Sequence, residues 1–178
     1  QLVAKRYPQS TCYALQSDAR QTSLCKNVLQ PRWWNPQRWI SSGIVFDVPP
    51  APVQMLWANM SLHMCEDPQA LLAQWHGLLE TSGFLMFSCL GPDTLRQLRQ
   101  VYAKAGWPPP AHLFVDMHDW GDMLLQVGFV DPVMDMERIS LTFESPERLL
   151  QELRELGRNL HSERFPGLRG RRWRQRLI

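Results

Sequence analysis

The sequence predicts an open α/β sheet whose strands are mostly parallel. Three consecutive segments between residues 53 and 89 carry this prediction: an apolar run of strand length, an amphipathic segment with helical spacing, and a second apolar run. A strand, a crossover helix and a second strand within about forty residues form the βαβ unit of a parallel sheet. Such sheets bind ligands at the carboxyl ends of their strands, so residues 59–63 and 90–93 are the first segments to inspect for function.

The boundaries of this central unit follow from local signals. The first strand is expected over residues 53–58. Asp67, followed by a proline at the first helical position, predicts where the helix begins. Ser82-Gly83 is expected to break the helical pattern and to precede a strand over residues 84–89. The apolar stripe of the helix consists of Leu71, Trp75 and Leu78, joined by Leu72 and Leu79.

The segments before the central unit are less regular. Residues 2–6 are typical of a helix end, residues 11–15 of a strand, residues 17–27 of a helix and residues 37–41 of a weak strand. Residues 42–52 contain a glycine and three prolines, so they are expected to be irregular.

The segments after the central unit continue the alternation. Helices are expected over residues 92–106, 116–127 and 145–157, each ending at or beside a glycine. Residues 129–134 and 138–143 are strand-like with no helix between them, which predicts an antiparallel hairpin at the edge of the sheet.

Composition excludes several classes of protein. A chain of 178 residues suits one domain with a real core, and no apolar stretch reaches the roughly 18 residues that span a bilayer. The first residue is Gln1, and no signal-peptide pattern is present, so we expect a part of a longer cytoplasmic protein. The four cysteines show no CxxC pair and no zinc-ligand spacing, which favours reduced thiols over disulfides and over a metal site.

Charge is concentrated at one end of the chain. The net charge is only +2, yet residues 164–178 hold six arginines and no acidic residue. This asymmetry predicts an acidic partner. Nucleic acid fits less well, because no binding motif or interleaving of aromatic and basic residues accompanies the charge.

Several motifs together resemble one known family. They are AsnMetSerLeuHisMet at residues 59–64, SerGlyPheLeuMetPheSerCysLeuGlyProAspThrLeuArgGlnLeuArg at 82–99, PheValAspMetHisAspTrpGlyAspMetLeu at 114–124 and GlyPheValAspProValMetAsp at 128–135. The chain resembles the BioC family, strongest over residues 56–172. These are malonyl-acyl-carrier-protein methyltransferases of biotin synthesis, which use S-adenosylmethionine (SAM).

The resemblance implies a Rossmann-like class I methyltransferase sheet, mostly parallel with an antiparallel edge hairpin. Residues 1–178 would form a single, partial domain that opens inside the first helix of that fold. The first strand and its glycine-rich SAM loop would then lie upstream of Gln1. Glycine is needed in that loop because the backbone must approach the ligand closely.

The resemblance also implies where SAM would bind. Gln16 stands where the family has an acidic residue for the ribose hydroxyls, and Ser42 stands near the adenine position. Asn59 would lie near the transferred methyl group, although its amide could equally cap a turn. His63 could orient the substrate, or be a packed, hydrogen-bonded histidine. The expected SAM-binding residues are Gln16, Ser17, Ser42, Gly43, Asn59, Met60 and His63.

The implied chemistry needs no catalytic nucleophile or base. A malonyl carboxylate, with a pKa of about 4, is ionised near pH 7 and can attack the SAM methyl group directly. Arg96, Arg158 and His118 are the candidate residues for holding the substrate. Arg99 is a further candidate. A solvated helix face is the alternative explanation for each of these arginines, and it is the favoured one for Arg99. Asp116 beside His118 could suggest a metal, but it serves equally as an N-cap.

The basic end would bind the acidic acyl carrier protein through Arg169, Arg171 and Arg172, with no membrane or nucleic-acid partner. The sequence leaves the oligomeric state open. Two alternatives to the methyltransferase also remain. One is a non-catalytic or SAM-impaired relative. The other is a different enzyme on the same scaffold, such as an arginine hydroxylase-like assembly factor.

Overall fold

The computed structural model describes most of the chain in two separate units. The described residues are 3, 6–15, 44–155, 159, 161–167 and 169–177. Contacts cluster within Gln1–Gln54 and within Met55–Ile178, and each unit is treated by itself below. A single domain over residues 1–178 therefore stays a prediction. The helix expected at 17–27 and the strand expected at 37–41 lie outside the described residues.

The first unit contains a small parallel sheet. Strand β1 (Cys12–Tyr13) pairs with β2 (Ile44–Val45), with Cys12 opposite Ile44. The N–H of Ala14 extends the pairing by donating to the Val45 carbonyl at 2.8 Å. Strand β1 confirms the centre of the expected strand at 11–15. The expectation that all of 42–52 is irregular is wrong at two residues, because isoleucine and valine are β-branched and favour extended backbone.

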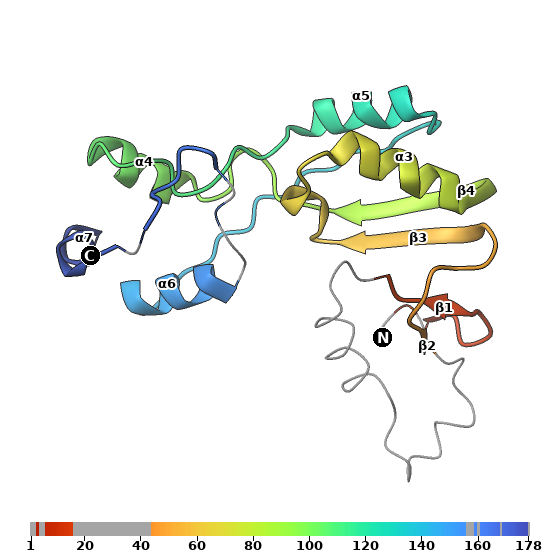
Figure 1. Cartoon of the computed structure of the whole chain (residues 1–178), viewed down its shortest axis with the longest axis horizontal. Coiled ribbons are helices and arrows are strands. Elements are labelled where there is room, and N and C mark those ends of the chain that lie inside the picture. The colour runs from red at the N-terminus through yellow and green to blue at the C-terminus, as the bar shows by residue number, and fades with distance from the viewer. Residues whose placement is uncertain are drawn as a thin grey trace, which may run out of the picture. The chain divides into compact units, whose positions relative to one another are not determined.

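The second unit contains the predicted βαβ arrangement. Strands β3 (Val53–Asn59) and β4 (Leu79–Ser88) form a two-stranded sheet and run in the same direction (Figure 1). The 3₁₀ turn η2 (Leu62–Met64) and helix α3 (Pro68–Leu78) connect them, and α3 packs against β4. This arrangement confirms the mixed α/β class with parallel strands.

Helix α3 begins where the sequence predicts and ends without the expected break. The Asp67 side chain accepts a hydrogen bond from the Ala70 N–H at 2.9 Å, as an N-cap does. At the other end, Leu79 is already extended while its N–H still bonds the His76 carbonyl. Strand β4 therefore starts directly at Leu79, and the prediction that Ser82-Gly83 separates helix from strand is wrong. Ser82 instead lies within β4 with a positive φ of 66°.

Four further helices follow β4. Helix α5 starts after the N-cap Asp116 and ends at Gly128, whose φ of 112° suits glycine, as predicted. Helix α4 starts later than expected, because residues 92–95 form turns and Leu95 adopts a positive φ of 58°. The four helices are α4 (Arg96–Lys104), α5 (Met117–Val127), α6 (Pro146–Glu155) and α7 (Arg171–Leu177).

The expected hairpin at 129–143 is not formed in the structure. These residues contain no strand, and several of their apolar side chains stand in solvent, with Val133 93% and Ile139 73% exposed, whereas Phe129 and Met134 pack against the core. A strand needs a neighbouring strand for its N–H and C=O groups, and none of the described residues lies alongside this segment as a ladder partner. The strand-like pattern of these residues therefore predicted a hairpin, but a hairpin forms only where two strands can pair, and the pattern does not show whether they do.

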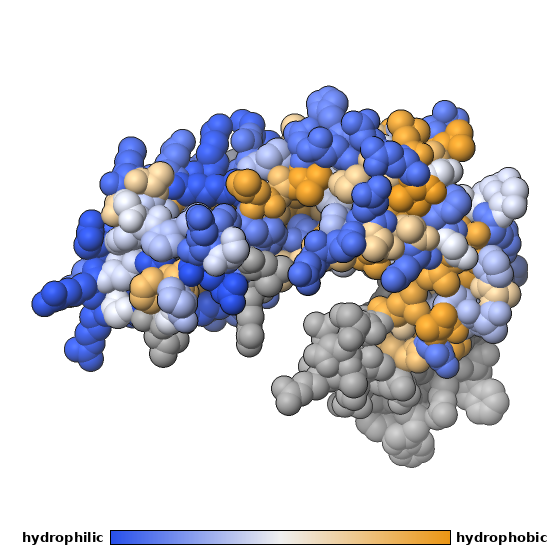
Figure 2. Space-filling view, turned by 45° about the horizontal axis from the view of Figure 1, so that its top comes forward, coloured by the Kyte–Doolittle hydropathy of each residue, from blue (hydrophilic) through white to orange (hydrophobic). Residues whose placement is uncertain are grey.

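The core lies between the sheet and the helices α3 and α5, which lie side by side on one face of the strand pair (Figure 1). Trp120 of α5 stacks edge-to-face on Phe87 of β4, with ring centroids 5.8 Å apart. Hydrophobic side chains gather over this end of the unit, whereas hydrophilic ones cover the end that carries α4 and α7 (Figure 2). Among the described residues, no helix is long and apolar enough to cross a membrane. The buried core residues are Ala58, Leu62, Leu72, Trp75, Trp120 and Leu124.

Candidate functional site

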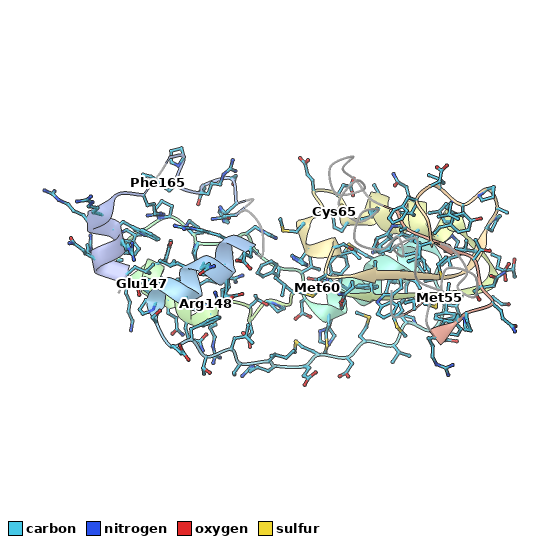
Figure 3. The ribbon with its side chains drawn as sticks, turned by 90° about the horizontal axis from the view of Figure 1, so that it is seen from below. Met55, Met60, Cys65, Glu147, Arg148 and Phe165 are labelled. Atoms are coloured by element: carbon cyan, nitrogen blue, oxygen red, sulfur yellow. The ribbon has the colours of Figure 1, made fainter. Side chains whose placement is uncertain are left out.

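The carboxyl ends of β3 and β4 meet, as the sequence predicts for a ligand-binding edge. The Met60 N–H donates to the Ser88 carbonyl at 2.9 Å, and the Ser88 hydroxyl donates to Asn59 Oδ1 at 2.6 Å. Met60 lies at this end of β3, and Met55 lies toward the other end (Figure 3). Asn59 is exposed, and its amide nitrogen makes none of the hydrogen bonds found among the described residues. The Asn59 side chain is therefore held in place through its Oδ1, while its N–H₂ group can donate to a ligand at this edge.

The chain turns sharply after β3. Met60 takes a left-handed conformation with a φ of 52°, which costs a non-glycine residue on the order of 1 kcal/mol. Leu62, only 1% exposed, anchors the following 3₁₀ turn in the core. The burial of Leu62 offsets the cost at Met60, so residues 59–63 follow a defined path across the edge of the sheet.

His63 ends this path and is packed. Its ring lies edge-on to Phe114 at 6.0 Å, and its Nδ1 is buried with no hydrogen-bond partner in the described part of the chain. Burial lowers the pKa of His63 below 6.5, and the neighbouring His112 lowers it further. The ring is packed, as one interpretation of His63 expects, but the hydrogen bond that this interpretation also expects is absent at Nδ1 among the described residues, and a role in orienting substrate stays a prediction.

The structure adds His112, which the sequence interpretation missed. Its ring Nε2 lies 2.6 Å from the His63 carbonyl oxygen, and because a carbonyl can only accept, Nε2 carries the proton. The ring also packs on Phe114, with centroids 4.6 Å apart. The one signal in the sequence was a lone polar side chain directly after a proline-rich, apolar stretch, which does not by itself indicate a partner.

Arg99 is an internal connector rather than part of a solvated helix face, so the simpler sequence interpretation of it is wrong. It is half-buried, and its guanidinium donates to the carbonyls of Pro92 and His112, each at 3.2 Å. The group also lies over the Phe114 ring at 5.4 Å. A planar guanidinium with several donors can join two backbone segments in this way.

His118 and Asp116 form a local pair at the start of α5. The Asp116 carboxylate accepts from the His118 N–H at 2.9 Å and lies 2.7 Å from its Nδ1. The backbone hydrogen bond, followed by the one from the ring, lowers the pKa of Asp116. The side chain of His118 is 80% exposed, and no hydrogen bond between described residues joins it to Asn59. Nowhere in the described ranges do three or more histidine, cysteine or acidic side chains gather as metal ligands would.

The remaining predicted residues divide into exposed and undescribed ones. Arg96 is exposed, and its guanidinium makes no ion pair with any described residue. Arg138 pairs with Asp93 in the loop after β4. The predicted residues that lie outside the described part of the chain are Gln16, Ser17, Ser42, Gly43 and Arg158.

At the basic end, Arg169 is engaged within the protein. Its guanidinium lies within 4.7–5.8 Å of four aromatic rings, those of Tyr102, Trp107, Phe165 and Trp173. Burial raises the pKa of Tyr102, an effect opposed by the charge of Arg169. This aromatic cluster fixes α7 through cation–π contacts.

The arginines of α7 itself divide into two that face solvent and two that contact other parts of the protein, one of them Arg176 over the Trp107 ring. Arg171 and Arg172 are exposed and make no ion pair with the described residues, whereas Arg174 bonds Glu147 of α6 at 3.0 Å. Figure 3 labels Glu147 on α6 and Phe165 before α7. Of the three arginines predicted to bind a partner, two are therefore available and one supports the helix that presents them.

Comparisons with known proteins agree with the motifs. The chain is 43% identical over 127 residues to a malonyl-[acyl-carrier protein] O-methyltransferase of Gallionella capsiferriformans. It is similar in sequence to this group of enzymes. The identity is 41% over 126 residues for the Laribacter hongkongensis enzyme of the same name and 33% over 171 residues for that of Xylella fastidiosa. The resemblance stated from the motifs is confirmed.

The alignments cover a larger share of this chain than of the malonyl-[acyl-carrier protein] O-methyltransferases that it matches. The matches cover 71%, 70% and 95% of this chain. They cover 44%, 42% and 57% of the Gallionella, Laribacter and Xylella enzymes. The chain thus spans about half the length of the curated relatives it matches. No family model matches the chain.

Proposed function

We propose that this chain is part of a SAM-dependent O-methyltransferase that methylates the free carboxyl of malonyl-acyl carrier protein in biotin synthesis. The observation that carries the proposal is the 43% identity to a relative with that printed activity. The meeting of Asn59 and Ser88 at the carboxyl edge of parallel strands supports it, since α/β sheets bind their ligands there.

The residues present at this edge fit the methionine end of SAM. SAM supplies a methyl group on a positively charged sulfur. Asn59 offers an amide N–H₂ that makes no hydrogen bond among the described residues. The turn at Met60 and the packed His63 lie in the same short segment, residues 59–63. Burial lowers the pKa of His63, which favours its neutral form and would keep an additional positive charge out of a site for a cationic cofactor. Gln16, Ser17, Ser42 and Gly43 lie outside the described residues and stay predicted SAM-binding residues.

The protein's contribution to the reaction is to hold the acceptor and to exclude water. The malonyl carboxylate is ionised at neutral pH, so no residue has to remove a proton from it. Arg96 makes no ion pair with the described residues and is the one among them best able to orient the carboxylate through paired N–H donors. Arg158 and His118 are the other candidates. Holding carboxylate oxygen and methyl carbon in line accounts for the rate enhancement in this scheme.

The decisive experiment incubates the full-length protein with methyl-labelled SAM and malonyl-acyl carrier protein. Formation of a base-labile methyl ester on the carrier is expected. Carrier protein loaded with an acetyl group, which lacks the free carboxyl, is the matched control and should remain unlabelled. A full-length protein that binds SAM but forms no ester would refute the proposal.

Docking of the carrier is assigned to Arg171 and Arg172 on α7, because these two arginines are exposed and unpaired among the described residues. Reversing both charges is expected to raise the KM for malonyl-acyl carrier protein about tenfold, while the KM for malonyl-pantetheine stays unchanged. Arg148→Glu on α6 is the control, since Arg148 is already paired with Glu152. Equal effects on both substrates would contradict docking at α7.

A further inference from the structure

The segment 59–63 is held at both of its ends, by two different sets of hydrogen bonds. At the strand end, Met60 and Asn59 bond Ser88 of β4. At the far end, the His63 carbonyl accepts from His112. This carbonyl is near the end of the 3₁₀ turn, where backbone oxygens lack partners within the turn itself. The His112 side chain supplies that missing donor.

His112 is itself fixed by its surroundings. It follows three consecutive prolines, which are stiff and have no N–H groups, and the adjacent Ala111 is only 8% exposed. The His112 carbonyl accepts from Arg99, which also bonds the Pro92 carbonyl in the loop after β4. The Asn159 side chain holds the same proline stretch by donating to the Pro109 carbonyl at 2.9 Å.

A continuous chain of contacts therefore joins the two loops at the carboxyl edge. It runs from Pro92 through Arg99 to His112 and then to His63, separately from the strand-end bonds to Ser88. We infer that His112 is a positioning residue, which holds the segment 59–63 in the geometry needed for methyl transfer. The inference rests on the proposed function for what this segment binds, but the restraint itself is a property of the protein alone.

The test replaces the donor while keeping the bulk of the side chain. His112→Leu fills a similar volume without a donor, whereas His112→Gln places an amide N–H₂ close to the position of Nε2. The first readout is amide hydrogen exchange of Met64 and Cys65 in the full-length protein, because both N–H groups bond within the turn. The Leu variant should exchange there about fivefold faster, and the Gln variant should restore protection.

Amides of α3 serve as the internal reference. Unchanged exchange at Met64 and Cys65 in the Leu variant would overturn the inference. So would equal acceleration throughout α3, since that would show general loosening, and so would a Gln variant that behaves like the Leu variant. These outcomes are decided without any methyl-transfer activity, so they are separate from a failure of the proposed function.

The second readout is kinetic. His112→Leu should lower kcat for methyl transfer about fivefold, leave the KM for malonyl-acyl carrier protein unchanged, and recover in the Gln variant. A Leu variant with faster exchange at the turn but a normal kcat would refute positioning for the reaction. An inactive wild-type protein would refute the proposed function, and the exchange data would then still decide whether His112 restrains the segment.

Discussion

Leu62 connects the core to the candidate site, so its truncation gives a sharp test of the structure. The side chain is 1% exposed and packs in the cluster with Trp75 and Trp120. Leu62→Ala removes buried apolar volume that its rigid neighbours refill only in part. The expected loss is about 3 kcal/mol of unfolding free energy, within the roughly 2–5 kcal/mol found for buried leucines.

The assay is urea unfolding followed by tryptophan fluorescence, because Trp75 and Trp120 lie in the same cluster as Leu62. Leu113→Ala is the matched control: it is the same substitution in the second unit, at a side chain that is 76% exposed. The control should change the unfolding free energy by less than about 0.5 kcal/mol. Equal effects of the two substitutions would show that Leu62 is not buried, and the path of residues 59–63 derived from its burial would be wrong.

Three further predictions follow from local contacts. Asp67→Ala removes the bond to Ala70 and should destabilise the protein by about 1 kcal/mol in urea unfolding, while Asp67→Asn should retain most of the stability. Gly128→Ala should lower the midpoint temperature of thermal unfolding and reduce the free energy of unfolding by roughly 1–2 kcal/mol, because the φ of residue 128 is 112° and the new Cβ would lie 3.4 Å from the His76 ring. An unchanged midpoint temperature would contradict the left-handed conformation of residue 128. Burial lowers the pKa of His63 in the folded state from its ordinary value of 6.5, so on acidification the unfolded chain protonates this histidine before the folded protein does. The free energy of unfolding should therefore fall as the pH drops through about 6.5. His63→Gln should remove part of this pH dependence, which is measured as the urea midpoint from about pH 8 to about pH 5.5.

The features that the sequence predicted correctly depend on neighbours in the chain. Asp67 caps α3 through a residue three positions later, and Gly128 ends α5 through its own φ. The alternation of apolar segments was sufficient for the parallel β3–β4 pair, because a crossover helix between two strands restricts the topology. The meeting of Asn59 with Ser88 at the end of β4 then followed from the direction of the strands.

The features that the sequence missed depend on distant partners. Residues 129–134 and 138–143 are strand-like, and the second segment alternates in polarity, but pairing also requires a free neighbouring edge, which the sequence pattern does not encode. Arg99 has the spacing of an exposed helical residue, yet two carbonyls from separate loops make it internal. His112 lies 49 residues from the carbonyl that it binds, so no local periodicity could have predicted the contact.

The arrangement of the arginines at the basic end has a related explanation. A short helix such as α7 (Arg171–Leu177) is marginal by itself, and an excess of like charge makes it less stable. Arg169 within the aromatic cluster and the Arg174–Glu147 pair anchor it at either side of Arg171 and Arg172. Arg176 adds a further contact by lying over the Trp107 ring at 5.3 Å. These engaged arginines stabilise the helix, whereas Arg171 and Arg172 make no ion pair with the described residues and can attract an acidic partner. The uneven charge of the sequence predicted a negatively charged partner. Which arginines stabilise α7 and which stay exposed could be seen only from their contacts with the aromatic rings.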